Sequence, residues 1–224
     1  MDFSFLSKYG SLFLEGTSVT VIISLVALLF GCIIGMLICL MKLSTFKVLK
    51  AVATTYIEIL RGTPLFVQIY IIYFGLPQVG IDFPSILGIS SDFIAGAFAL
   101  SINSGAYVAE ILRSGIQSVE KGQMEASRSL GLGYAATMRY VIVPQAIKNI
   151  LPSLANEFIT LVKESAIISV IGVREIMFTS SIVKNATYKP LEPLIVAAII
   201  YFILTFTLSK LVGKFEKKLA KANA

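Results

Sequence analysis

The sequence predicts an all-α integral membrane protein with five transmembrane helices and one short polar helix outside the bilayer. Composition is the first observation: 56% of the 224 residues are hydrophobic, 14% are charged, and the mean hydropathy is +0.85. A soluble domain carries about 25% charged residues. Long apolar runs and an uneven distribution of Lys and Arg are the second and third observations. At this length we expect a single domain, residues 1–224.

Five segments meet the requirement of about 20 mainly apolar residues for a membrane-spanning helix. They are residues 16–41, 52–76, 93–112, 145–171 and 191–212. The first contains no charged residue, whereas the second holds Glu58 and Arg61 in its first half. The fourth is the least regular, because four charged residues interrupt it: Lys148, Glu157, Lys163 and Glu164.

Two glycines in the first span, Gly31 and Gly35, are four residues apart. This spacing allows two membrane helices to approach closely. Glycines are also frequent in membrane helices for other reasons, so the sequence alone assigns no interface to them.

The positions of Lys and Arg predict the orientation, because cytoplasmic loops carry an excess of both. The loops after the first and third spans and the C-terminal segment hold Lys42, Lys47, Lys50, Arg113, Lys121, Arg128, Arg139, Lys210, Lys214, Lys217, Lys218 and Lys221. The other side holds only Lys8, Arg174, Lys184 and Lys189. We therefore expect the N-terminus outside and the C-terminus inside. The net charge of +6 then reflects topology rather than nucleic-acid binding.

Several classes of function are disfavoured by what the sequence lacks. It contains no His, which removes the usual zinc ligand and the commonest general base. Cys32 and Cys39 lie in one apolar run, where we expect them to pack as small apolar residues rather than to form a disulfide or a metal site. No Gly-rich phosphate loop is present. We expect no metal and no cofactor in this chain, and an intramembrane enzyme is disfavoured.

A short polar helix is predicted between the third and fourth spans, at about residues 123–131. Gly122 precedes it, and Gly131 and Gly133 end it, as expected where a helix needs a left-handed C-terminal residue. Met124, Ser127 and Leu130 are three apart and share one face. The residues leave two interpretations open: a helix that docks into a partner's groove, or an amphipathic helix on the lipid surface.

The stretch EASRSLGLGYAATMRYVIVP, residues 125–144, resembles the EAA motif of ABC importer permeases. That motif reads Glu-Ala-Ala, three residues, Gly, nine residues, an apolar residue, one more, and an apolar-Pro pair. Glu125, Gly131, Val141, Val143 and Pro144 fall at these spacings. Ser127 replaces the second Ala, a mild departure. Residues 56–68, 103–123 and 144–172 resemble further blocks of the polar amino acid subfamily, so the resemblance covers nearly the whole chain.

The resemblance implies a mechanism and a set of partners. Permeases of this family work in pairs, and each lends a cytoplasmic coupling helix to a cleft in an ATP-binding cassette subunit, which binds the ATP and Mg²⁺. The resemblance also implies a second permease chain, either an identical copy in a homodimer or a paralogue in a heterodimer. It further implies a solute-binding protein outside and a bacterial inner or plasma membrane. The resemblance implies that the short helix contacts the ATPase, through Glu125, Ala126, Arg128, Leu130 and Gly131.

Polar side chains inside the third and fourth spans are the best pointers to a transport route, because such side chains are costly in lipid and normally face protein or water. Asn103 and Tyr107 share a face of the third span with Glu110, and Ser104 is beside them. Asn156, Glu157 and Thr160 lie near the middle of the fourth span. Glu157 either meets a substrate cation or pairs with Arg61. Tyr107 either contacts substrate or packs as a core aromatic, and Glu110 is expected to pair with Arg113.

The second span contains a predicted break. Gly62 and Pro64 should unwind or kink the helix, and the freed backbone groups, with Thr63 and Gln68 beside them, are then available to a polar ligand. Arg61 is interpreted as a residue at the cytoplasmic end of the span or as a partner of Glu58 or Glu110.

These residues favour an importer of polar amino acids, with basic ones (arginine, histidine, lysine) ahead of glutamine because of the acid at Glu157. Two alternatives stay open: a permease for another small polar solute, and a membrane scaffold that recruits a cytoplasmic partner. The intramembrane Asn103 and Glu157 favour transport, since a scaffold has no need of them.

Overall fold

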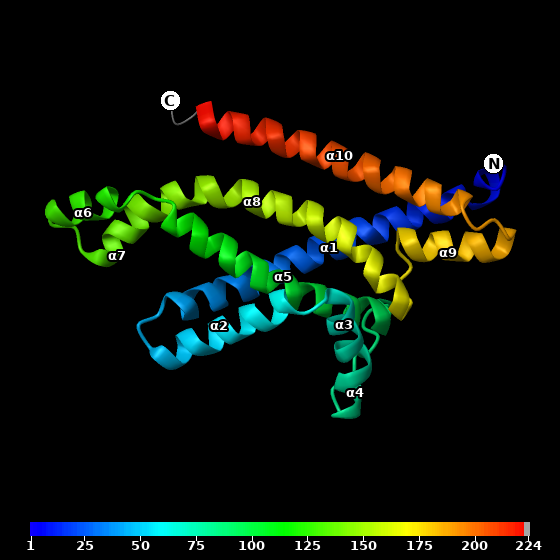
Figure 1. Cartoon of the computed structure of the whole chain (residues 1–224), viewed down its shortest axis with the longest axis horizontal. Coiled ribbons are helices and arrows are strands. Elements are labelled where there is room, and N and C mark those ends of the chain that lie inside the picture. The colour runs from blue at the N-terminus through cyan, green and yellow to red at the C-terminus, as the bar shows by residue number, and fades with distance from the viewer. Residues whose placement is uncertain (222–224) are drawn as a thin grey trace.

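The computed structural model describes residues 1–221, and apart from one isolated bridge between Ile86 and Ile89 these residues form helices and loops. Long helices run along the long axis of the molecule (Figure 1): α1 (Leu6–Leu43), α5 (Ser91–Gln117), α8 (Val143–Glu164) and α10 (Glu192–Lys221). The short helix α6 (Lys121–Ser129) lies at one end, called here the α6 end. The N-terminus and α9 (Ile176–Thr187) lie at the opposite end.

Three of the described helices are long and apolar enough to cross a membrane, and the number rises to as many as five if each of two bent pairs counts as one span. One pair joins α2 (Lys47–Gly62) to the segment Leu65–Gln78 with a bend of 108°. That segment consists of α3 (Leu65–Tyr70), a π-helical turn (Ile71–Gly75) and α4 (Leu76–Gln78). The other pair joins Tyr134–Ile171 to Ile176–Thr187 with a bend of 49°. The predicted segments 16–41, 93–112 and 191–212 thus correspond to single helices, and 52–76 corresponds to a helix broken after Gly62. The segment 145–171 lies within the first member of the second bent pair.

The break predicted at Gly62 and Pro64 is present and larger than a kink. Helix α2 ends at Gly62, and α3 begins at Leu65 immediately after Pro64. Proline has no backbone N–H and disfavours helical backbone in the residue before it. As a result the segment of α3 and α4 turns by 108° from the direction of α2 (Figure 1).

Other boundaries differ from the sequence prediction. Helix α1 begins at Leu6, ten residues before the predicted start, and α5 extends to Gln117. The fourth segment begins at Tyr134 with α7 (Tyr134–Thr137), continues as a π-helical turn (Met138–Ile142) into α8, and ends in a 3₁₀ helix (Ser165–Ile171). Pro144 lies in the first turn of α8, directly after the π-helical turn.

Helix α9 occupies a segment between the fourth and fifth predicted spans in which the sequence analysis predicted no helix. Glu175 begins the helix: its carboxylate accepts hydrogen bonds from the backbone N–H groups of Met177 (2.8 Å) and Phe178 (2.6 Å). The phenol of Tyr201 on α10 donates to the same carboxylate at 2.6 Å. A fully buried acid therefore fixes the start of α9 and ties it to α10.

The contact between α1 and α5 depends on small residues. A Cβ atom at Gly31 would lie 2.9 Å from the Ser104 hydroxyl, and one at Gly35 would lie 2.6 Å from a methyl of Val108. On the facing helix, a Cβ at Gly105 would lie 2.6 Å from a methyl of Ile34. Gly31 and Gly35 therefore serve close helix approach, the first of the two readings left open by the sequence.

Candidate functional site

Four polar side chains that the sequence singled out meet in the interior: Gln68 of α3, Asn103 and Ser104 of α5, and Glu157 of α8. Each is at most 8% exposed. The Asn103 amide donates to the Gln68 side-chain oxygen at 2.8 Å, and the Ser104 hydroxyl donates to the Glu157 carboxylate at 2.8 Å. Asn103 and Ser104 are adjacent in sequence, and we call the two pairs together the buried polar cluster.

The break after α2 supplies the backbone acceptors for this cluster. The Gln68 amide nitrogen donates to the carbonyl oxygens of Leu60 (2.8 Å) and Thr63 (3.0 Å) and to the Thr63 hydroxyl (2.9 Å). The carbonyls freed by Pro64 are thus already satisfied by Gln68, whereas the sequence interpretation reserved them for a ligand. Thr63 and Pro64 themselves are exposed at the edge of the cluster.

Glu157 is the acid of the cluster, and among the described residues it forms no ion pair. The expected alternative partner, Arg61, lies instead over the ring of Tyr107, 5.3 Å from its centroid. The pairing of Glu157 with Arg61 is therefore absent from this structure. Burying a carboxylate without a cation is costly, and here one hydroxyl, that of Ser104, is the hydrogen-bond donor recorded for it.

Glu110 belongs to a separate cluster nearer the α6 end. It forms salt bridges with Arg113 (2.8 Å) and with Lys42 at the end of α1. The Glu110–Arg113 pair was predicted, and Arg61 is not its partner. Lys42 could not be assigned from sequence, because its contact depends on the packing of α1 against α5.

The remaining predicted site residues lie beside the buried polar cluster. Tyr107 is half-buried and takes part in the contact with Arg61. Thr160 is half-buried one turn beyond Asn156, to whose carbonyl its hydroxyl donates at 3.2 Å. Neither residue contacts Glu157 through a recorded hydrogen bond.

Helix α6 is the short polar helix predicted at about residues 123–131, shifted toward the N-terminus. Gly131 has φ +88°, and its N–H donates to the carbonyl of Arg128 while that of Leu132 donates to the carbonyl of Ser127. This pair of bonds is a Schellman C-terminal motif, which favours glycine at its left-handed position. Gly133 has φ −64° and so does not have the left-handed role expected of it.

The side chains expected to contact a partner are exposed on α6. Glu125, Ala126, Arg128 and Leu130 are all exposed, Leu130 by 84%. Leu130 was expected to share a face with Met124 and Ser127, but Ser127 is buried and Leu130 follows the last residue of the helix. An exposed leucine beside charged residues is suited to a groove in another protein.

Comparison with known proteins identifies the family. Residues 27–221 match the family described as binding-protein-dependent transport system inner membrane component. The chain belongs to this family. It is 43% identical to the arginine transport system permease protein ArtQ of Bacillus subtilis, over 100% of this chain and 99% of that protein. It is 45% identical to a putative glutamine transport system permease protein, GlnP, of Rickettsia bellii, over 97% and 98%.

Solved structures of two transporters share the fold. A crystal structure of an amino acid ABC transporter with histidines superposes with a TM-score of 0.91 at 50% identity, covering 97% of this chain and 99% of that one. An inward-facing structure of the MetNI methionine ABC transporter superposes with a TM-score of 0.78, covering 98% and 99%. At 18% identity the second likeness concerns the fold alone.

Family membership settles the general role of the chain. It is a multi-pass inner membrane component of a binding-protein-dependent transporter, which implies a solute-binding protein and an ATP-binding subunit. ATP is hydrolysed by that separate subunit, so this permease chain is not an enzyme. Transport also accounts for a polar cluster inside an apolar bundle, for which a scaffold offers no reason.

Proposed function

We propose that this permease imports polar amino acids, with basic ones preferred. The carrying observation is Glu157, a nearly buried carboxylate with one hydroxyl donor and no cation among the described residues. An intramembrane acid needs a positive partner or a water-filled cavity. The side chain of arginine, lysine or protonated histidine supplies that positive charge during transport.

The neighbouring groups suit the rest of the substrate. An amino acid zwitterion requires both donors and acceptors, and the Gln68–Asn103 pair offers amide groups of both kinds. Ser104 follows Asn103 in the chain and donates to Glu157. Thr63, Pro64, Tyr107 and Thr160 complete the site at the periphery of the cluster. Binding replaces the amide–amide and hydroxyl–carboxylate bonds by bonds to substrate.

Glutamine is the second candidate substrate. The amide pair of Gln68 and Asn103 can bind a side-chain amide as readily as a zwitterion. Relatives of similar identity are named for arginine and for glutamine transport. Basic amino acids require the negative charge of Glu157 for binding, whereas glutamine does not. This difference separates the two candidates experimentally.

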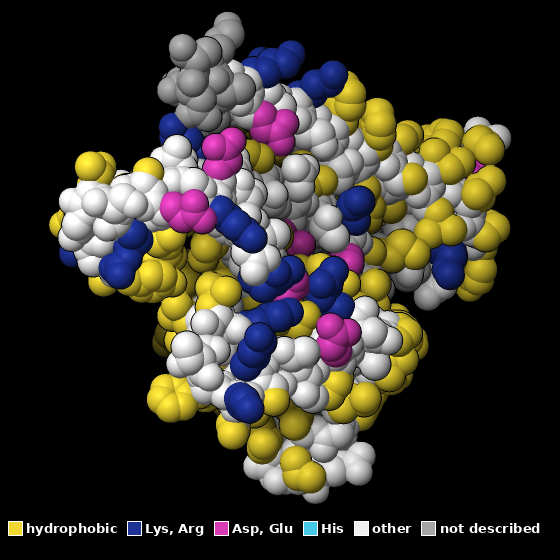
Figure 2. Space-filling view, turned by 60° about the vertical axis from the view of Figure 1, so that its left-hand side comes forward, with side chains coloured by type: hydrophobic (Ala, Val, Ile, Leu, Met, Phe, Trp, Pro, Cys, Tyr) yellow, Lys and Arg dark blue, Asp and Glu magenta, His cyan; other side chains and the backbone are white. Residues whose placement is uncertain are grey.

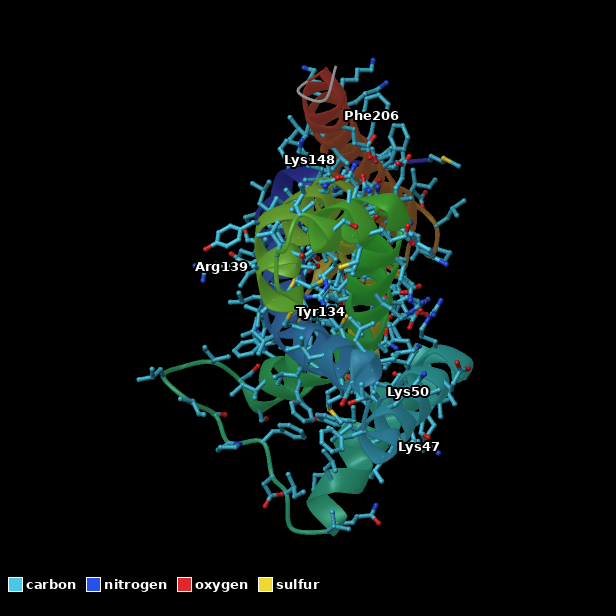
Figure 3. The ribbon with its side chains drawn as sticks, turned by 90° about the vertical axis from the view of Figure 1, so that its left-hand side faces the viewer. Lys47, Lys50, Tyr134, Arg139, Lys148 and Phe206 are labelled. Atoms are coloured by element: carbon cyan, nitrogen blue, oxygen red, sulfur yellow. The ribbon has the colours of Figure 1, made fainter. Side chains whose placement is uncertain are left out.

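The α6 end is assigned to the cytoplasm, with the N-terminus outside, the C-terminus inside and five spans in one domain of residues 1–224. The distribution of cations supports this orientation. Figure 3 faces the α6 end, where Lys47 and Lys50 of α2, Arg139 after α7 and Lys148 of α8 are labelled. In Figure 2, which turns this end toward the viewer, Lys and Arg side chains gather near the middle of the face and hydrophobic ones cover its flanks.

Helix α6 is assigned as the contact with the ATPase. Its exposed Glu125, Ala126, Arg128 and Leu130 fit a cleft in that subunit, and Gly131 sets the angle of the chain that follows. The ATPase binds ATP and Mg²⁺, and no cofactor is held by the permease itself. Closure of two ATPase subunits moves two copies of this chain, as a homodimer, between inward-facing and outward-facing states.

Equilibrium binding to the purified permease–ATPase complex tests the proposal, with a panel of the twenty amino acids. We expect selective binding of a basic amino acid, weakened roughly ten- to hundredfold in Glu157→Gln, because a hydrogen bond to a charged group contributes about 1.5–3 kcal/mol. Glu164→Gln is the matched control, since it removes a nearby acid outside the cluster. Glutamine binding that is indifferent to Glu157→Gln would instead select the second candidate, and no binding of any amino acid would overturn both.

A further inference from the structure

Helix α8 leaves two different faces uncovered. One carries polar residues at Asn149, Ser153, Asn156, Thr160 and Lys163, of which all but the half-buried Thr160 are exposed. Their spacing alternates between four and three residues, so they form a single stripe along the helix. We call Asn149, Ser153 and Asn156 the α8 track. The other uncovered face is apolar and includes Ile147 (44% exposed) and Leu151 (37%).

The two faces require different surroundings in a membrane. Ile147 and Leu151 are suited to lipid. Polar side chains within a span face protein or a water-filled cavity. The track therefore faces something other than lipid.

The track adjoins the buried polar cluster at one end. Asn156 immediately precedes Glu157, which accepts a hydrogen bond from Ser104 of α5. Toward the α6 end, the Asn149 amide donates to the Ser118 hydroxyl at 2.8 Å, just beyond the end of α5. The track thus runs beside the α5–α8 contact from the acid of the cluster to the end of α5.

A polar cavity lies at the α6 end of the track. Its volume is about 670 Å³, and its lining includes Ser118, Glu120, Gln123, Gln145 and Asn149. Gln123 belongs to α6, and the Gln145 amide of α8 approaches its side-chain oxygen at 3.4 Å. The same cavity therefore touches the track and the helix assigned to the ATPase contact.

The track groups suit a route better than a fixed site. The Ser153 hydroxyl donates to the carbonyl of Asn149 at 3.3 Å, and the Asn156 amide donates to that of Pro152 at 3.1 Å. These donors are satisfied by their own helix when nothing is bound, and their oxygens stay available as acceptors. The track carries no charge between Asn149 and Asn156, so it can solvate a zwitterion without holding it tightly. A conducting path requires such weak binding.

We infer that the amino acid leaves the buried polar cluster along Asn156, Ser153 and Asn149 and reaches the cytoplasm through the cavity between α5, α6 and α8. The inference rests on the proposed function for its direction and its substrate class. A second copy of the chain forms the facing wall, with water between the two. Because α6 contributes Gln123 to the cavity, movement of α6 by the ATPase changes the exit at the same time.

Thiol accessibility tests the route in the full permease–ATPase complex. The only cysteines are Cys32 and Cys39, and replacing both by Ala gives a background into which Ser153→Cys, Asn156→Cys, Ile147→Cys and Leu151→Cys are introduced singly. The cysteine thiolate, which forms in water and not in lipid, attacks the sulfenyl sulfur of a charged, membrane-impermeant methanethiosulfonate reagent. A mixed disulfide forms and methanesulfinate is released. We expect the two track positions to react at least about tenfold faster than the two lipid-face controls. Arginine should slow modification of Asn156→Cys.

Three results would overturn the route. Equal modification rates at all four positions would mean that the two faces have the same surroundings. No reaction at any of the four would mean that protein covers the track and excludes water from it. Faster reaction at Ile147→Cys and Leu151→Cys would reverse the assignment. The proposed function is judged separately, by amino acid binding to the same cysteine-free complex, so either idea can fail while the other stands.

Discussion

The two sides of α5 differ in how they are packed. Toward α1, the contact depends on glycines, and Gly31 and Gly35 allow the two helices to touch with no room for a methyl group. Toward α3 and α8, at the level of the buried polar cluster, the same helix instead offers Asn103 and Ser104, which bind polar groups of both neighbours. A close glycine contact toward α8 occurs only nearer the C-terminal end of α5, where Gly115 faces Ile150. The first side suits a rigid frame. The second suits a surface whose hydrogen bonds are exchanged during transport.

The difference indicates which helix contacts can change during transport. Close-packed interfaces do not deform continuously, because small changes in volume produce clashes or voids. Hydrogen bonds can instead be exchanged with a ligand or water at little net cost. We therefore expect α1 and α5 to move as one body, while α3, α6 and α8 change their contacts.

The largest effect is expected at the contact between α1 and α5. A substitution there tests whether the two helices are close-packed or only lie near each other. In Gly35→Ala the new methyl would lie 2.6 Å from a Val108 methyl and 2.9 Å from the Ala109 backbone nitrogen. We expect a loss of about 1–3 kcal/mol, the usual cost of overpacking, seen as a lower thermal unfolding midpoint in detergent. Gly10→Ala is the control in the same helix, because nothing lies within 4 Å of that position. Equal midpoints for the two variants would show that the α1–α5 contact yields easily.

An intermediate effect is expected at the end of α6. Gly131 has φ +88°, a conformation that costs an L-amino acid roughly 1–2 kcal/mol. Gly131→Ala should displace the turn after α6 and lower substrate-stimulated ATP hydrolysis several-fold, while amino acid binding is retained. Gly133→Ala is the control, since its φ is −64° and nothing lies within 4 Å. If both variants hydrolyse ATP like the parent complex, the angle after α6 does not transmit the movement.

The fold was predictable where the signal is local. Apolar runs located the long helices, the Gly62–Pro64 break was expected from proline chemistry, and Gly131 was placed at its left-handed position by the helix end it follows. Helix α9 was missed because Glu175 begins it with support from Tyr201, more than twenty residues away in sequence. A contact of that range leaves no trace in local periodicity.

The candidate site was predictable by residue type and not by pairing. Asn103 and Glu157 were chosen because polar groups inside a span are costly, and both are buried in the cluster. Their partners depend on the 108° bend that carries Gln68 to α5. The sequence therefore assigned Arg61 to an acid, whereas the structure places it over Tyr107.

The smallest effect is expected at the end of the molecule opposite α6. The prediction there tests how much one ion pair contributes to the stability of that end. Lys189 donates to the exposed Asp2 carboxylate and holds the pKa of Asp2 below its usual range, with help from the Ser4 N–H and hydroxyl. A lowered folded-state pKa contributes stability above the unfolded pKa, about 3.9, and loses it as the pH falls through the folded value. Because the pair is exposed and screened by salt, Asp2→Asn should change the unfolding midpoint at pH 7 only slightly, and the difference from the parent should vanish in strong acid. A large loss at pH 7 would mean that charge, and not close packing as in the α1–α5 contact, holds this end together.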